Sequence, residues 1–147
     1  KPVLGTNPAG KLLTNGIRGS LKYSDFEWCS WADNDSVSFT IDLLKLEMLN
    51  TLILGCITNN GMAIHKPASV RVEVSDDNSK FREAVVQSFT SEEIFREGNF
   101  IENLSLKLGG TQARYVRVTA KGPGVCPASH VRPGQTSRIF FDEVMLE

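Results

Sequence analysis

Residues 36–43 read Ser-Val-Ser-Phe-Thr-Ile-Asp-Leu, and this stretch is the strongest indicator of the fold. Its apolar side chains occupy every second position, and serine, threonine and aspartate stand between them. Successive side chains of a β-strand point to opposite faces, so the alternation predicts a half-buried strand with one face on a core and the other in water.

Similar runs recur along the chain and are separated by turn clusters such as Asp76-Asp77-Asn78-Ser79. Helical signal is limited to one short turn over residues 91–96, with Thr90 or Ser91 as its N-cap and Gly98 at its end. Many short strands at this spacing predict an all-β fold, an antiparallel sandwich or barrel. The six further predicted strands cover residues 51–58, 69–75, 81–89, 100–108, 114–120 and 138–146.

The length of 147 residues fits one compact domain over residues 1–147, with residues 1–11 as a linker or N-terminal arm. The formal net charge is only -1 and no run of lysine and arginine stands out, which argues against nucleic acid and anionic membranes as partners. The longest apolar run, residues 52–54, is far shorter than the roughly 20 residues of a membrane helix. We expect a soluble monomer.

The three cysteines, Cys29, Cys56 and Cys126, lack the paired short spacings of zinc or redox motifs. Cys56 alternates with apolar neighbours and is expected to be a buried small hydrophobe. Cys29 and Cys126 both lie in loop-like sequence. Their spacing leaves two alternatives open, one disulfide or two free thiols.

The two long irregular segments, residues 14–35 and 123–137, are where we expect the functional site, because ordering such loops has an entropic cost that packing or a ligand must offset. The sequence offers no catalytic candidate: it has two histidines and no zinc-protease, nucleophile-elbow or phosphate-loop motif. Asp142 and Glu143 are adjacent on a predicted strand, so they would face opposite ways, unlike a glycosidase pair. An enzyme active site is therefore not excluded by these residues but is left without a candidate.

Several short motifs in order resemble a discoidin-like domain, also called the coagulation-factor C-type or galactose-binding-like fold. They are Leu-Leu-Thr-Asn-Gly-Ile-Arg-Gly-Ser at 12–20, Trp28 and Trp31, the strand and Ser-Asp-Asp turn at 69–77 followed by Phe81, and the segments 115–118 and 141–144. The resemblance covers residues 12–147. It implies a β-sandwich jelly roll.

Within that superfamily the chain is most similar to family-32-like carbohydrate-binding modules, in particular those at the C-terminus of bacterial β-N-acetylhexosaminidases (chitobiases). Residues 126–130, 133–134 and 139–143 carry this likeness. It implies a non-catalytic module, secreted or periplasmic, that binds galactose or an N-acetylhexosamine and keeps an attached hydrolase near its glycan. The alternatives are a structural interdomain module and a protein- or lipid-binding discoidin domain.

The resemblance also implies a structural calcium site. Asn15, Gly16 and Ser20 match the family's calcium-binding loop, and Glu143 matches the carboxylate that closes it. Calcium prefers six to eight oxygen ligands, and Asn15 in place of the usual aspartate removes one formal charge, so the affinity should be reduced. The alternative is an ion-free turn held by hydrogen bonds of the Asn15 amide.

The predicted sugar site combines an aromatic platform with polar side chains that read hydroxyl groups. Trp28 is the candidate platform, with a core position as its alternative, whereas Trp31 is expected in the core. Asn59 and Asn60 could equally form a solvated turn, His130 could make a structural hydrogen bond, and Arg132 could be an exposed surface residue. The predicted ligand-binding residues are Trp28, Asn59, Asn60, His65, His130, Arg132 and Gln135.

Overall fold

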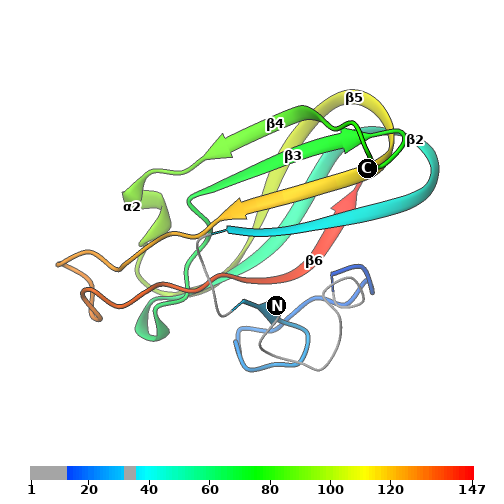
Figure 1. Ribbon diagram of the computed structural model, residues 1–147. Coiled ribbons are helices and arrows are strands. Elements are labelled where there is room, and N and C mark those ends of the chain that lie inside the picture. Colours follow the sequence, from blue (N-terminus) through cyan, green and yellow to red (C-terminus); the bar gives the residue numbers. More distant parts are fainter. Residues whose placement is uncertain (1–12, 32–35) are drawn as a thin grey trace.

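The computed structural model describes residues 13–31 and 36–147 as a nearly all-β molecule with a single hydrogen-bonded sheet (Figure 1). The sheet is antiparallel and its strand order is β1-β6-β2-β5-β3-β4. The predicted linker, residues 1–11, lies outside the described residues. The elements are β1 (Cys29–Ser30), β2 (Ser36–Asn59), the 3-10 helix η1 (Asn60–Met62), β3 (Ser69–Ser75), β4 (Arg82–Ser88), α2 (Ser91–Ile94), β5 (Asn99–Lys121) and β6 (Phe140–Leu146).

The sheet folds back on itself because its two longest strands, β2 and β5, both bend (Figure 1). Residues 36–42 of β2 pair with 115–121 of β5, and residues 51–59 pair with 99–107, with register shifts between the two stretches. At this bend Gly109 and Gly110 both have positive φ angles, which glycine adopts without steric cost. One layer therefore holds β4, β3 and one half of each long strand, while β1, β6 and the other halves form the second.

This arrangement confirms the predicted antiparallel β-sandwich and corrects the number of strands. The predicted strands 36–43 and 51–58 are two halves of β2, and 100–108 and 114–120 are two halves of β5. The sequence pattern breaks at each bend, but the hydrogen-bond ladder continues across the bulges. Strands β3 and β4 match the predicted strands to within one residue at each end.

The main core lies between the two layers and consists of alternate residues from facing strands. Val70, Val72 and Val74 of β3 are fully buried, as the alternation predicts. Val116 and Val118 take the inner face of β5, so Tyr115 is only half-buried. Trp31 packs edge-on against Phe141 in this core, at 5.6 Å between ring centroids, as predicted.

The short helix α2 begins as predicted at an N-cap threonine. The Thr90 hydroxyl accepts a hydrogen bond from the Glu93 backbone N–H at 3.2 Å, and the Glu93 carboxylate accepts one from the Thr90 backbone N–H at 3.3 Å. This reciprocal capping box satisfies two N–H groups that would otherwise lack partners. Neither α2 nor η1, the helices in the described part of the chain, has the length and apolar character needed to span a bilayer.

Candidate functional site

Three segments that are distant in the sequence meet at one end of the sandwich: η1, α2 and the loop of residues 122–139 between β5 and β6 (Figure 1). Backbone hydrogen bonds join the residues that directly follow η1 to the 122–139 loop. The His65 N–H donates to the Arg138 carbonyl at 3.0 Å, and the Arg138 N–H donates to the Ala63 carbonyl at 2.9 Å. The two loops that follow β2 and β5 are therefore fixed to one another, as a binding site requires.

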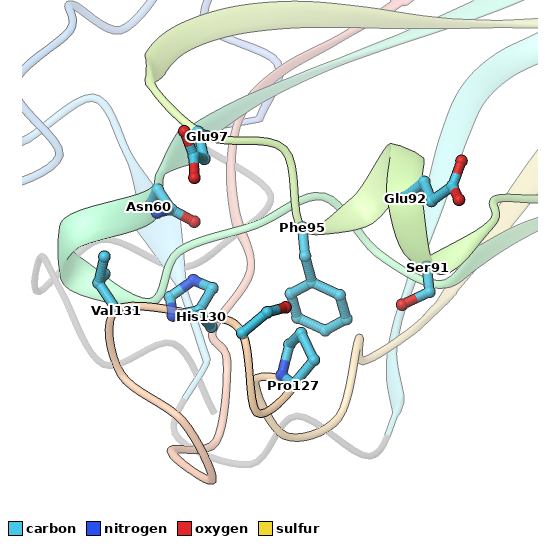
Figure 2. Close-up of a pocket in the computed structure, with 9 residues that line it drawn as sticks. Asn60, Ser91, Glu92, Phe95, Glu97, Pro127, His130 and Val131 are labelled. Carbon is cyan, nitrogen blue, oxygen red and sulfur yellow. The ribbon is translucent and has the colours of Figure 1, made fainter.

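A pocket of about 280 Å³ opens between these segments (Figure 2). The Phe95 ring extends into the space between α2 and the 122–139 loop, on the side facing Pro127. It packs edge-on against the His65 ring at 5.1 Å and the His130 ring at 6.2 Å, so its orientation is held by two neighbours. The lining residues are Asn60, Ser91, Glu92, Phe95, Glu97, Pro127, Ser129, His130 and Val131.

The polar groups of the pocket are suited to hydrogen bonding with hydroxyl groups. Ser91 and Ser129 supply hydroxyls, and Glu92 and Glu97 supply two carboxylates, while no lysine or arginine is among the lining residues. The buried side-chain oxygen of Asn60 accepts no hydrogen bond from any described residue. A buried acceptor without a donor costs about 1–3 kcal/mol, so a ligand hydroxyl or water molecule that reached this oxygen would remove that cost.

Two of the seven predicted sugar-binding residues, Asn60 and His130, line this pocket. Asn59, Arg132 and Gln135 do not. The guanidinium of Arg132 donates to the Gly61 carbonyl and, at 3.4 Å, to the Gln135 side chain, so both residues brace η1 and the neighbouring loop from outside the pocket. The backbone of Asn59 pairs with that of Ile64 and closes the turn around η1.

His65 lies behind the pocket wall and is fully buried, which corrects its prediction as a direct sugar contact. Its Nε2 atom is 2.9 Å from Nε2 of His130. Burial, helped by the nearby His130, lowers the pKa of His65 to about 4, against the opposing effect of the Ile94 carbonyl. The imidazole is therefore neutral near pH 7 and its role in this wall is structural.

Trp28 does not serve as an exposed platform, because its side chain has no exposed surface. It packs with Ile57, Ile64 and Phe140 in a second, smaller core cluster, and its indole N–H donates to the Ser20 carbonyl at 2.8 Å. A Cβ atom at Gly19 would collide with the indole ring, so glycine is required there. Of the two alternatives for Trp28, an exposed platform and a core position, the structure shows the core position.

The sequence reasoning missed the contribution of α2 and the residues that follow it. Ser91, Glu92 and Phe95 belong to the predicted short helical turn and Glu97 follows it, and nothing local indicates that this segment faces residues 127–131. The usable signal was an aromatic side chain next to a well-capped single turn that Gly98 ends, since such a turn presents Phe95 in a fixed direction.

The predicted calcium loop is occupied by internal hydrogen bonds. The Gly16 N–H donates to the Glu143 carboxylate at 3.0 Å, the Ile17 N–H to the Asn15 side-chain oxygen at 2.8 Å, and the Lys22 N–H to the Ser20 hydroxyl at 3.2 Å. Burial raises the pKa of Glu143, against the opposing effect of the Gly16 N–H that donates to its carboxylate. These contacts are those of the ion-free turn, in which the side-chain oxygens of Asn15 and Glu143 each accept a backbone N–H.

All three cysteines are free and buried. Burial raises the pKa of the Cys29 thiol to about 11 and also raises the pKa values of Cys56 and Cys126. Of the two alternatives for Cys29 and Cys126, the structure shows two free thiols.

The fold is shared with carbohydrate-binding modules of bacterial enzymes. The CpGH89CBM32-6 module produced by Clostridium perfringens is 16% identical, with a TM-score of 0.59 and coverage of 100% of this chain and 91% of that one. The C-terminal domain of a chitobiase from Bacteroides fragilis is 17% identical, with a TM-score of 0.53 and coverage of 95% and 79%.

A third similar structure is the CBM32 of AlyQ in complex with 4,5-unsaturated mannuronic acid, at 16% identity, TM-score 0.59 and coverage of 100% and 92%. At these identities the likeness establishes the fold. A comparison with curated protein sequences gives no significant match. The family model of the F5/8 type C domain matches residues 4–132, most of the chain. With this match, and a sandwich whose loops gather around one pocket, the chain belongs to the F5/8 type C, or discoidin, family.

Proposed function

We propose that this chain is a non-catalytic carbohydrate-binding module and that its ligand is a neutral hexose or N-acetylhexosamine unit at the end of a glycan. The observation that carries the proposal is the pocket between α2, η1 and the 122–139 loop, which combines one held aromatic ring with an unsatisfied buried acceptor. Its volume of about 280 Å³ is near the lower end of the range for small-molecule sites, which suits a single sugar ring better than a long oligosaccharide.

The lining chemistry matches the two faces of a pyranose. Phe95 offers an apolar surface for the C–H face of the ring, while Asn60, Ser91 and Ser129 offer hydrogen-bonding groups for its hydroxyls. A carboxylate accepts hydrogen bonds from hydroxyls more strongly than a neutral oxygen does, so Glu92 and Glu97 add affinity for sugars with free hydroxyl groups.

The charge of the pocket supports the preference for an uncharged sugar. Two carboxylates line it and no lysine or arginine is among the lining residues, so a uronic acid would meet repulsion between like charges. This distinguishes the chain from its structural neighbour, the AlyQ module, whose ligand is an unsaturated mannuronic acid. An N-acetylhexosamine carries no charge and meets no such cost.

The biological role that we propose is to hold an attached glycoside hydrolase, of the β-N-acetylhexosaminidase or chitobiase kind, near its substrate outside the cytoplasm. The chitobiase domain among the structural neighbours supports this choice of parent enzyme. A module that binds its sugar weakly is still effective when it is linked to the hydrolase, because once the module is bound, the linked enzyme is present at a high effective concentration near the glycan.

The test is a titration of the chain, followed by NMR, with galactose, N-acetylgalactosamine, N-acetylglucosamine and glucuronic acid. We expect at least one neutral sugar to shift signals of residues around Asn60 and Phe95, and glucuronic acid to bind more weakly. Phe95→Ala should weaken binding by about tenfold, a loss of about 1.4 kcal/mol. Phe26→Ala is the matched control, because Phe26 is 81% exposed and lies outside the pocket.

Two results would contradict the proposal: no response to any of the four sugars, or an equal loss of binding in Phe95→Ala and Phe26→Ala. A separate variant tests the role of charge. Glu92→Gln should narrow the difference in affinity between N-acetylglucosamine and glucuronic acid. Glu83 is an exposed residue of β4 outside the pocket, so Glu83→Gln should leave that difference in affinity unchanged.

An interdomain packing module is the second candidate function, and one observation favours it. Leu44, Leu46 and Met48 are exposed at the bend of β2, at the end of the sandwich opposite the pocket (Figure 1). Exposed apolar groups that lie close together often mark a contact surface. A chain that binds no sugar but whose attachment to the hydrolase raises the melting temperature of that enzyme would favour this function.

A further inference from the structure

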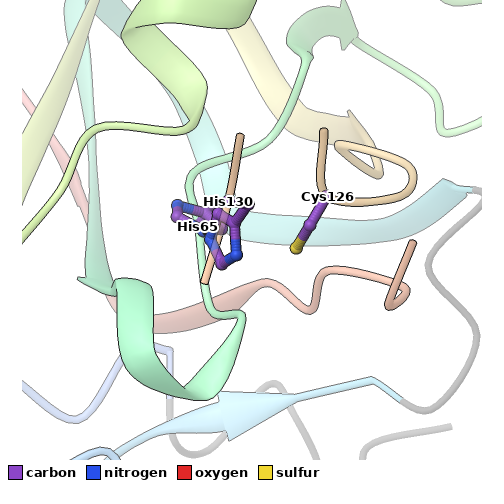
Figure 3. Close-up of side chains that lie close together, drawn as sticks. All are labelled: His65, Cys126 and His130. Carbon is purple, nitrogen blue, oxygen red and sulfur yellow. Dashed lines mark hydrogen bonds between the residues drawn. The ribbon is translucent and has the colours of Figure 1, made fainter. Parts of the chain in front are cut away.

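At the pocket wall, three side chains with metal-binding atoms converge: His65, Cys126 and His130 (Figure 3). Their exposed fractions are 0%, 2% and 8%. One ligand atom from each lies within 4.8 Å of those of the other two, and residues 13–31 and 36–147 contain no other such group of three histidine, cysteine or acidic side chains. The group joins the segment between η1 and β3 to the loop between β5 and β6.

We propose that His65, Cys126 and His130 bind one Zn²⁺ ion, which fastens these two loops to one another. Two imidazole nitrogens and one thiolate form a ligand set that zinc accepts readily, and three protein ligands leave a fourth position open. The proposal is independent of the proposed sugar binding, because none of its evidence involves a sugar.

The present distances are close to those that a tetrahedral ion needs. Two nitrogens bound to zinc at about 2.0–2.1 Å lie about 3.3 Å apart, and a nitrogen and a sulfur bound at about 2.3 Å lie about 3.6 Å apart. The two Nε2 atoms are now 2.9 Å apart, so they need to separate slightly. Figure 3 shows the Cys126 sulfur directed toward the two rings; it lies within 4.8 Å of one nitrogen of each histidine, so an approach of about 1.2 Å at most brings it to the distance that zinc needs from those nitrogens.

The surroundings of His65 suit metal binding through Nε2. Nε2 of His65 faces His130, while Nδ1 is buried without a hydrogen-bond partner among the described residues and the Ile94 backbone lies near the imidazole. Metal-bound histidines commonly direct their other N–H at a backbone carbonyl, which sets the tautomer. The ion can enter from the pocket, because His130 is also one of the pocket-lining residues, and a water molecule from there can take the fourth position.

The metal-free arrangement is a different hydrogen-bond network. Nδ1 of His130 accepts the Arg132 N–H at 2.9 Å, so the His130 proton is on Nε2 and is donated to Nε2 of His65. When zinc binds, the Cys126 thiol loses its proton to solvent, the His130 proton moves from Nε2 to Nδ1, and the contact with the Arg132 N–H opens. One proton is released for each ion bound, with no change in oxidation state.

The test uses the 147-residue chain after treatment with a chelator. Calorimetric titration with Zn²⁺ should give one ion per chain and raise the melting temperature. Co²⁺ in place of Zn²⁺ should produce a thiolate-to-metal charge-transfer band in the near ultraviolet. Cys126→Ser should remove that band and weaken Zn²⁺ binding. Loss of a residue that only contacts a metal ligand lowers the affinity for the metal by roughly 10- to 100-fold, and loss of the ligand Cys126 should lower it by more.

The matched control is the double variant Cys29→Ala/Cys56→Ala, which leaves Cys126 as the sole thiol and should keep both the band and the affinity. It also keeps the test decisive if Cys126→Ser fails to fold, because absence of the band in the double variant would overturn the proposal. A cobalt band that persists in Cys126→Ser, or Zn²⁺ binding that is equal in the wild type and His130→Ala, would overturn it as well.

Discussion

Arg18 holds the N-terminal loop onto the last strand through a buried carboxylate, and its replacement by alanine should destabilise the fold measurably. Its Nε donates to Oδ2 of Asp142 at 2.8 Å, and the same oxygen accepts the Gly19 N–H at 2.9 Å. Asp142 has no exposed surface, and its other oxygen has no hydrogen-bond partner among the described residues. The carboxylate therefore depends on Arg18 for its charge compensation.

The size of the effect follows from this geometry. Removing one partner of a buried ion pair costs about 3–5 kcal/mol, because the remaining charge stays buried without compensation. The Arg18 side chain is 36% exposed, so water can reach part of the vacated space, and we expect a loss of about 2–3 kcal/mol. For a domain of this length that corresponds to a decrease in melting temperature of roughly 5–10 °C.

The assay is urea unfolding of Arg18→Ala beside Arg71→Ala. Arg71 also pairs with a carboxylate, that of Glu83, but both side chains are more than half exposed, so its loss should cost less than about 1 kcal/mol. In the double variant Arg18→Ala/Asp142→Asn the cost should be smaller than the sum of the two single losses, because no uncompensated charge is left. Equal stabilities of Arg18→Ala and Arg71→Ala would refute the reasoning.

Three further predictions concern the loops and turns. Gly19→Ala should lower the free energy of unfolding by an amount typical of core overpacking, about 1–3 kcal/mol, and with it the urea midpoint, since its methyl group meets the buried indole of Trp28; a midpoint equal to that of the wild type would contradict the packing described. Calcium added to chelator-treated protein should leave the melting temperature unchanged, because the oxygens of Asn15 and Glu143 already accept N–H groups; a rise would show that this loop rearranges around the ion, as the family resemblance implies. The N–H groups of Lys80 and Ser79 lower the pKa of Asp77 below 3.8, so the stability that this carboxylate contributes should be present above that value and be lost as the pH falls through the folded-state pKa. The melting temperatures of the wild type and Asp77→Asn should therefore converge in acid, and a difference that does not depend on pH would count against this.

Local patterns were sufficient for the fold class and for most of the strands. The alternation in residues 36–43 and 69–75 reports directly which side chains face the core, because side-chain direction in a strand depends only on the parity of the position. The Thr90 cap of α2 was also predictable, since a capping box involves residues only three positions apart.

The continuity of β2 and β5 was not predictable in this way. Their hydrogen-bond ladder runs across bulges where the alternation breaks, and only the pairing of the two strands shows that each is one element. The burial of Trp28 also depends on contacts between distant parts of the chain. Its neighbours Ile57 and Phe140 come from other parts of the chain, so a loop-like local sequence gave no indication that the ring is enclosed.

The candidate site depends even more on contacts between distant residues. Asn60 and His130 were predicted from the sequence because they lie in long segments between strands, where the family resemblance implies sugar contacts, but the pocket exists only where these segments meet Phe95 and Glu97. In the group of His65, Cys126 and His130, the last two residues are only four positions apart, but His65 lies more than 60 positions before them, so no local motif joins all three. The periodicity of the sequence shows which face of its own strand a residue occupies. Which distant residues it meets across the loops depends on how the sheet folds over, and that is a property of the whole chain.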